Sequence, residues 1–127
     1  MALEWDSGEG FRSRKLLVSG PGRAHLAEIL PDRTGIRFRS DVPEEKGIEN
    51  SIRLAGTGAA AGDVGGDGGC DLFFCSMGGR SVLYRNPGDW KFEDITATAG
   101  VACEGQDSTG AAFADVEGDG DLDLLIN

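Results

Sequence analysis

The sequence has no long hydrophobic segment, and this absence excludes two kinds of segment at once. Among its first thirty residues no strictly apolar run exceeds three residues, as at Leu16–Val18, and charged residues interrupt the whole stretch. Such a run is too short for the core of a signal peptide and far too short to cross a bilayer. No signal peptide is visible in this sequence, and we expect no membrane span.

Histidine and basic residues are also scarce. His25 is the only histidine, and Ser108 has no evident histidine–aspartate pair to activate it, so no catalytic triad is predicted. The sequence holds 12 Lys and Arg against 22 Asp and Glu, a formal net charge of −10. Because nucleic-acid phosphates require basic partners, nucleic acid is a poor candidate partner. We therefore expect neither an enzyme nor a nucleic-acid-binding protein.

Glycine, by contrast, is abundant. The 127 residues include 21 glycines and are 39% hydrophobic, which suits a turn-rich all-β protein of one domain better than a helical bundle. The acidic excess is localised, because residues 58–127 hold three Lys and Arg against thirteen Asp and Glu, whereas residues 1–57 are balanced. Much of this acid lies in two short clusters, which indicates cation binding.

An internal repeat organises the second half of the chain. Gly58–Val64 aligns with Gly110–Val116, and the alignment continues without a gap to Leu72 and Leu124. Within one period, turn-forming residues separate four short segments with strand character. These predicted strands lie near 57–63, 71–76, 81–86 and 91–96. Four strands in a period of about 50 residues are typical of one β-propeller blade.

The repeat predicts a β-propeller segment of about two four-stranded blades. The second period reaches only about the end of its second strand at Asn127, and two blades cannot close a ring, so we expect an incomplete propeller that continues into further blades. Ile36–Val42 resembles the fourth strand of the next period, and our hypothesis is that it completes the last blade, as an N-terminal strand does in many propellers. The bulky residues of the outer strands are expected to fill the space between blades; they are Leu83, Tyr84, Trp90 and Phe92.

Two acidic loops carry the candidate chemistry. Residues 63–71 and 115–123 both have carboxylates at positions 1, 5 and 9 and a glycine at position 6. Calcium takes roughly six to eight oxygen ligands, and oxygens at alternate positions of a tight loop can converge on one ion. Simple hairpin turns are the alternative, but two such loops in register disfavour it. Without a cation, the five carboxylates of the second loop would repel one another.

Two other interpretations of these motifs fail. An EF-hand requires a glutamate at position 12 and flanking helices, whereas position 12 is Phe74 in one loop and Ile126 in the other. The stretch Gly56–Gly62 resembles a dinucleotide-binding glycine loop, but Asp63 and further glycines follow where a helix would have to begin.

The two loops are predicted to be unequal. The second has Glu117 at position 3, whereas the first has Gly65 there and lacks one ligand. We expect the second loop to bind calcium more tightly and the first to be weak or completed by water. The affinity should fall in the range of extracellular modules, about 10⁻⁴–10⁻³ M.

The three cysteines, Cys70, Cys75 and Cys103, allow at most one internal disulfide. If the strands alternate in direction, Cys75 and Cys103 lie at the same end of the blade and Cys70 at the other. A Cys75–Cys103 disulfide is therefore the favoured pairing, with buried free thiols as the alternative.

Several motifs together resemble a known family. They are the glycine–alanine strand Gly58–Val64, the two Asp-Gly loops, and Leu83–Asn86 followed by Phe92–Thr96. The chain is similar to the FG-GAP/VCBS repeats of integrin-α-like propellers and, more narrowly, to bacterial relatives of the cartilage acidic protein family, which often carry an ASPIC/UnbV domain. The resemblance covers residues 34–127, which it divides into a full repeat and a truncated one. Residues 1–33 form an N-terminal segment of unknown role.

The resemblance also implies a ligand set and a setting. It implies Ca²⁺ bound by side chains at seven positions and by the main-chain carbonyls of Gly69 and Asp121. The side-chain ligands would be Asp63, Asp67, Asp71, Asp115, Glu117, Asp119 and Asp123. We expect a non-catalytic calcium-binding module for extracellular or periplasmic adhesion, or for protein or glycan binding. An accessory propeller of a larger secreted enzyme, with its active site elsewhere, is the alternative.

Overall fold

The computed structural model of the chain describes residues 6–9, 11–13, 26–40, 42 and 56–127. β1 (Asp6–Gly8) and β2 (Phe11–Ser13) form a short antiparallel hairpin, and α1 (Pro31–Thr34) is a single helical turn. The remaining elements belong to the repeats. They are β3 (Ala59–Gly62), β4 (Asp71–Phe74), β5 (Val82–Gly88), β6 (Lys91–Asp94), α3 (Thr96–Ala99), β7 (Ala111–Ala114) and β8 (Asp123–Ile126).

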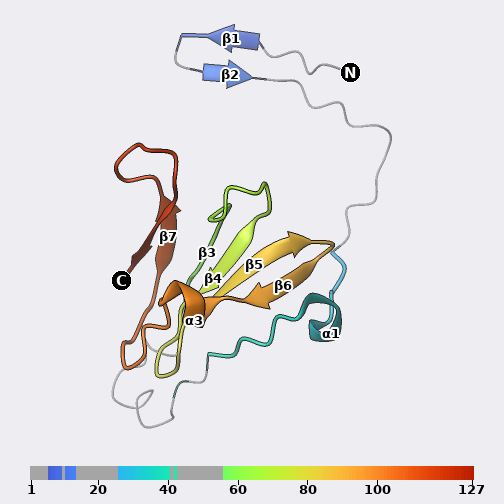
Figure 1. The fold of residues 1–127 in the computed structure, drawn as a ribbon, viewed down its shortest axis with the longest axis vertical. Helices are drawn as coiled ribbons and strands as arrows, with labels where there is room; N and C mark the ends of the chain where they lie inside the picture. Colours follow the sequence, from blue (N-terminus) through green and yellow to red (C-terminus); the bar gives the residue numbers. More distant parts are fainter. Residues whose placement is uncertain (1–5, 10, 14–25, 41, 43–55) are drawn as a thin grey trace.

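The first repeat is a four-stranded antiparallel sheet with the strands in sequence order, β3-β4-β5-β6 (Figure 1). Each of the four predicted strand regions overlaps one of these strands, and β5 extends two residues beyond its predicted region. β7 and β8 form a second antiparallel sheet, in which Ala114 pairs with Asp123 as Gly62 pairs with Asp71 in the first. The all-β prediction of one full blade followed by half of another is therefore confirmed.

The first strands of the two sheets lie side by side. The Gly58 N–H donates to the Thr109 carbonyl at 2.8 Å, just before β3 and β7 begin. A Cβ atom at Gly58 would lie only 2.9 Å from Gly110 Cα and from the Thr109 carbonyl oxygen. The small residues of these strands are thus required by the close approach of two backbones, as expected for the innermost strands of adjacent blades.

The core lies between the two sheets. Ala60, Phe73, Cys75 and Leu83 form a buried cluster on the first sheet. Partly buried apolar residues pack against this cluster, namely Ile95, Val101, Ala111, Phe113, Leu124 and Ile126. The prediction that bulky outer-strand residues fill the space between blades is confirmed for Leu83 but is wrong for Trp90. That side chain is 60% exposed, because it lies in the tight β5–β6 turn, where its own φ is 59°.

The segment after α1 packs against the blade through side chains rather than as a strand. Phe38 stacks on Phe74 with ring centroids 5.2 Å apart, and the Arg37 N–H donates to the Tyr84 hydroxyl at 3.1 Å. In the described part of Ile36–Val42, residues 36–40 and 42, the structure assigns no strand. These residues contact the first sheet through aromatic stacking instead of a hydrogen-bonded ladder. The hypothesis that they complete the last blade stays a prediction, because it concerns a blade other than the two seen here.

The three cysteines are free thiols, so the favoured Cys75–Cys103 disulfide is not formed. Cys75 is fully buried in the apolar cluster, whereas the Cys103 S–H points to the Val101 carbonyl at 3.4 Å. Burial, and secondarily the nearby Cys103 thiol, raise the pKa of the Cys75 thiol. Within the described residues, no helix has the length and apolar character needed to cross a bilayer.

Candidate functional site

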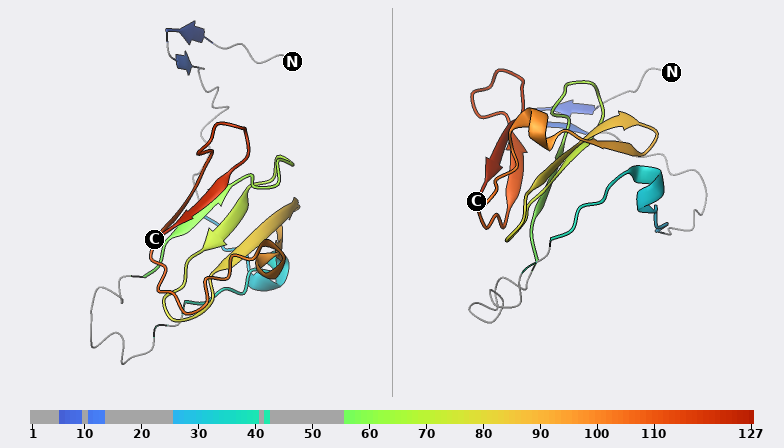
Figure 2. Two further views of the ribbon diagram at one scale, coloured as in Figure 1. Left: turned by 60° about the vertical axis from the view of Figure 1, so that its left-hand side comes forward. Right: turned by 60° about the horizontal axis from the view of Figure 1, so that its bottom comes forward.

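The two acidic loops occupy equivalent places in the two sheets. Each joins the first strand of its sheet to the second, from Gly62 to Asp71 and from Ala114 to Asp123. Both loops extend from the same end of the paired sheets, as the views in Figures 1 and 2 agree. The repeat seen in the sequence therefore places two acidic loops on one end of the molecule.

Hydrogen bonds to the backbone define the first loop. The two carboxylate oxygens of Asp63 accept the N–H groups of Asp67 and Gly68, at 3.0 and 2.8 Å. Asp67 Oδ1 accepts the Gly69 N–H at 2.9 Å. Gly68 has a φ of 85°, which confirms that the glycine at position 6 permits a turn that other residues resist. The first loop is therefore closed by its own backbone.

The last aspartate of the first loop is buried, and both of its carboxylate oxygens accept hydrogen bonds. Asp71 is only 2% exposed, and its Oδ2 accepts the Val64 N–H at 3.0 Å. Its Oδ1 accepts the Asn86 N–H of β5 at 2.8 Å. The Asn86 side chain also donates to the Cys70 carbonyl at 3.1 Å. The third strand of the blade thus holds the end of this loop.

Arg85, also in β5, supplies the first loop with a positive charge. Its Nη2 lies 3.3 Å from Asp67 Oδ2, in an ion pair that is about half exposed to solvent. The hydrogen bond from Gly69 and the nearby Arg85 guanidinium hold the pKa of the Asp67 carboxyl below its usual value. Asp67 is therefore charged across the whole neutral range of pH.

The second loop has the same backbone pattern and more acid. Asp115 accepts the N–H groups of Gly118, Asp119 and Gly120 at 2.6–3.1 Å. Asp119 Oδ1 accepts the Asp121 N–H, and Asp123 Oδ2 accepts the Val116 N–H, at 3.1 and 3.0 Å. Gly120 has a φ of 98°, matching Gly68. Residues 115–121 of the loop are exposed, whereas Leu122 and Asp123 are half-buried.

The two acidic loops have the right ligand atoms for a metal ion, but their side chains do not converge on one point in this structure. The two loops offer only oxygen ligands, which suits a hard cation such as Ca²⁺. Yet no three acidic, histidine or cysteine side chains among the described residues lie together in a way that could hold a metal. Positions 1 and 9 of each loop are turned toward backbone N–H groups instead. Convergence on an ion requires the exposed side chains of Glu117 and Asp119 to change rotamer.

The sequence prediction found the loop aspartates but not the residues of β5 that contact the first loop. Arg85 and Asn86 belong to a segment whose pattern predicts a strand and the family resemblance, but no contact with a loop. Their contacts depend on the register of β5 on β4, in which Tyr84 pairs with Leu72. The local signal of this register is the glycine turn between β4 and β5, at Gly78 and Gly79.

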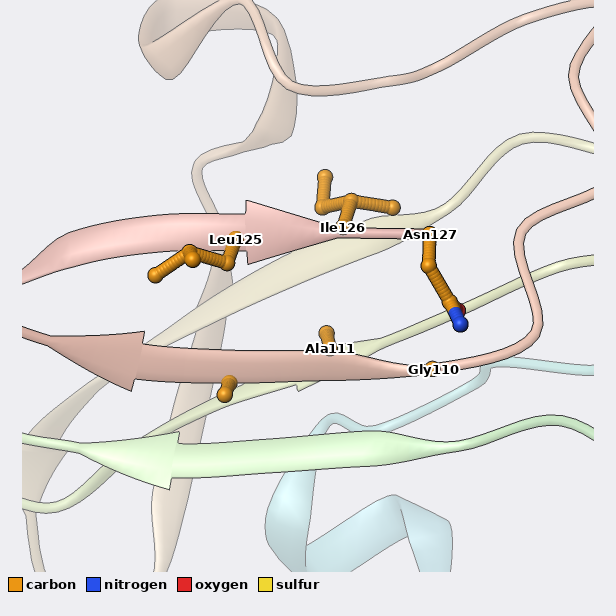
Figure 3. A pocket seen from close by; sticks show the side chains of 6 residues that line it. Gly110, Ala111, Leu125, Ile126 and Asn127 are labelled. Atoms are coloured by element: carbon orange, nitrogen blue, oxygen red, sulfur yellow. The ribbon is translucent and has the colours of Figure 1, made fainter.

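A shallow hollow along β7 and β8 differs in kind from the loops. Its lining is apolar or neutral, and Asn127 closes one end of it beside Gly110 (Figure 3). The lining residues are Gly110, Ala111, Ala112, Leu125, Ile126 and Asn127. None of them is titratable, so this surface offers no acid, base or nucleophile. His25, the only histidine, lies outside the described residues.

Comparison with known proteins gives one family and one group of relatives. The FG-GAP-like repeat pattern matches residues 63–126. Cartilage acidic protein 1 of Mus musculus and that of Homo sapiens are each 34% identical over an alignment of 104 residues that covers 79% of this chain. The protein of the same name from Xenopus tropicalis is 33% identical over 91 residues, 72% of this chain.

The aligned part amounts to 16%, 15% and 14% of these three relatives, so the chain spans only a small part of their length. No solved structure matches the chain significantly.

Proposed function

The chain belongs to the FG-GAP-like repeat family, and from this premise we propose that it is a calcium-stabilised, non-catalytic binding scaffold. The observation that carries the proposal is the equivalence of the two loops. Each has carboxylates at positions 1, 5 and 9, the same backbone hydrogen bonds at positions 1 and 9, and a glycine of positive φ at position 6.

The second loop is the principal calcium site of the proposal. Glu117 is exposed, and its carboxylate accepts no hydrogen bond from any described residue. Turning this side chain toward an ion costs little, because no interaction within the protein has to be broken. The frame of N–H groups around Asp115 stays in place and fixes the first ligand. Calcium would also reduce the repulsion among the five carboxylates of the loop.

Calcium in this role is structural. It would hold the ends of hairpins whose acidic side chains otherwise repel, and so present the loop end of the blades as a stable surface for a protein or glycan partner. An affinity of about 10⁻⁴–10⁻³ M is useful only where calcium is abundant, which favours an extracellular or periplasmic setting. The family resemblance supports the same setting.

Calorimetric titration of Ca²⁺ into the chain tests the proposal. We expect a binding isotherm with a Kd of about 10⁻⁴–10⁻³ M that reports mainly the second loop. Asp119→Asn removes one charge from that loop but keeps an oxygen to accept the Asp121 N–H. It should weaken binding about tenfold or more, because calcium affinity follows the number of charged ligands.

The matched control is Asp89→Asn, which removes one exposed carboxylate from the β5–β6 turn, outside both loops. It should leave the Kd unchanged. Absence of calcium binding at millimolar concentrations, or equal weakening by both variants, would contradict the proposal.

A further inference from the structure

The β5–β6 turn of the first sheet holds an exposed tryptophan on a strained backbone. Gly88 pairs with Lys91, so Asp89 and Trp90 are the two central residues of the turn, with φ angles of 53° and 59°. Turns with two positive φ angles favour Asn-Gly or Asp-Gly, because glycine has no Cβ atom to oppose the conformation. A bulky residue rarely adopts it. The Trp90 side chain is 60% exposed, so burial offsets little of this cost.

Trp90 lines a hollow of about 500 Å³ on the first sheet, here called the Trp90 hollow. Its apolar lining includes Leu72 and Phe92, and its polar lining includes Asn86 and Asp89. All of these residues belong to the first sheet and its turns, and the four strands of this sheet are all present. The volume lies within the range of about 300–1,000 Å³ that is usual for ligand sites. The strained tryptophan is therefore part of a surface that can hold a small group.

The Trp90 hollow carries negative charge and adjoins the first acidic loop. A second hollow shares Asn86 and Gly88 with it and extends to Asp67, and no lysine or arginine lines either one. Asp67 is already paired with Arg85, whose Nη2 lies 3.3 Å from its Oδ2. Asp89, in contrast, is exposed and has no hydrogen bond or ion pair with any described residue. Its carboxylate is available to a positively charged group.

The polar lining suits a cation better than a sugar. The Asn86 side chain donates to the Cys70 carbonyl at 3.1 Å, and its Oδ1 accepts the Gly88 N–H at 3.1 Å. Both ends of this amide are thus engaged within the protein, which leaves Asp89 as the main group for sugar hydroxyls. A site that orients a polar ligand needs several such groups. A cation requires less, because an indole face attracts it and one carboxylate neutralises it.

We propose that the Trp90 hollow binds a lysine or arginine side chain of a basic partner protein. The cation lies against the indole of Trp90 and pairs with the carboxylate of Asp89. The net charge of −10 favours the approach of such a partner. Tryptophan is also among the residues that contribute most to the affinity of protein interfaces. This inference rests on the proposed role as a binding scaffold and names its class of partner, but it does not require calcium.

NMR titration of the ¹⁵N-labelled full chain with tetralysine, blocked at both ends, tests the proposal. A chelator is present throughout, and the salt concentration is about 0.15 M, where screening limits charge attraction to about 8 Å. The amides of Gly88 and Lys91 and the indole N–H of Trp90 should shift until they saturate. Cellotetraose, a neutral tetrasaccharide, should leave the same signals unchanged.

Trp90→Gly separates binding from packing. It removes the indole and gives the turn its favoured sequence. Tetralysine binding, followed at Gly88 and Lys91, should weaken about twofold to thirtyfold, the range of a cation–π contact. The urea midpoint of unfolding should rise in the same variant, because the strained residue is gone. A tryptophan required for packing would instead lower that midpoint when it is replaced.

A pair of charge variants separates a specific contact from general attraction to an acidic protein. Asp89→Asn should weaken tetralysine binding. Glu104→Gln removes an equal charge from an exposed residue between α3 and β7, outside the hollow, and should leave the affinity unchanged.

The inference is overturned if Trp90→Gly keeps the native affinity for tetralysine or lowers the urea midpoint. Equal weakening by Asp89→Asn and Glu104→Gln would also overturn it, and so would a stronger response to cellotetraose than to tetralysine. Because the titration is made in chelator, failure of the chain to bind calcium would reject calcium stabilisation and leave these expectations as they are.

Discussion

At the scale of single residues, Thr96 joins β5, β6 and α3. It is fully buried, its Oγ1 accepts the Leu83 N–H at 2.9 Å, and its hydroxyl donates to Asp94 Oδ1 at 2.6 Å. The Asp94 carboxylate also accepts the Thr96 N–H at 3.0 Å and pairs with Arg80. One hydroxyl thus connects a buried backbone group with a charged group at the surface.

Replacing this hydroxyl should destabilise the fold. Thr96→Val keeps the shape of the side chain but leaves the buried Leu83 N–H without its acceptor. A buried donor left unmatched costs about 1–3 kcal/mol, so urea unfolding should show a loss of that size. Thr98→Val changes an exposed threonine of the same helical turn and should change the free energy of unfolding little. Equal losses in the two variants would contradict this role of Thr96.

Asp94 gives a pH dependence to the same cluster. Partial burial alone would raise the pKa of its carboxyl, but the hydrogen bonds from Thr96 and the nearby Arg80 outweigh burial and lower it. A folded-state pKa below the unfolded value of about 3.9 contributes stability that is present above that value and is lost as the pH falls through the folded pKa. Stability should therefore decline below about pH 4.

In Asp94→Asn this component of the acid sensitivity should be absent. Urea unfolding measured between about pH 3 and pH 7 gives the test, because the slope of unfolding free energy against pH reports the difference in bound protons. If the native chain and the variant lose stability in parallel below pH 4, the lowered pKa of Asp94 does not contribute to the stability of the fold.

At the scale of strands and loops, local patterns predicted much of the architecture. Short apolar segments between glycine-rich turns predicted the four strands of the first sheet, and the 52-residue offset predicted the second. The helical turns α1 and α3 were not predicted, because four residues are too few to show helical periodicity. The role of Arg85 was also missed, since its contact with Asp67 links residues on separate strands.

The contact between the first strands of the two sheets is sensitive to side-chain size. Gly58→Val would place a β-branched side chain against two backbone atoms only 2.9 Å from its Cβ. We expect a loss of about 1–3 kcal/mol, since neither backbone can yield without separating the sheets. Gly65→Val is the control, because a Cβ atom there meets only ordinary contacts at 3.7 Å or more. Urea unfolding that ranks the two variants equally would contradict this close approach.

At the scale of the whole molecule, the acidic residues and the apolar core lie in different places. The apolar cluster lies between the two sheets, whereas the acidic loops share one end of them (Figures 1 and 2). The whole net charge of −10 comes from residues 58–127. Eight of the thirteen acidic residues in that range lie in the two loops. A bound cation at this end would relieve repulsion where it is most concentrated.

The central claim is that calcium stabilises these blades through the second loop. Its most direct test is the free energy of unfolding in urea, measured with about 10 mM Ca²⁺ and again with a chelator. With a Kd of about 10⁻⁴–10⁻³ M, mass action predicts a gain of about 1.4–2.7 kcal/mol in calcium, and Asp119→Asn should lose most of it. Equal stability of the native chain in calcium and in chelator would contradict the claim.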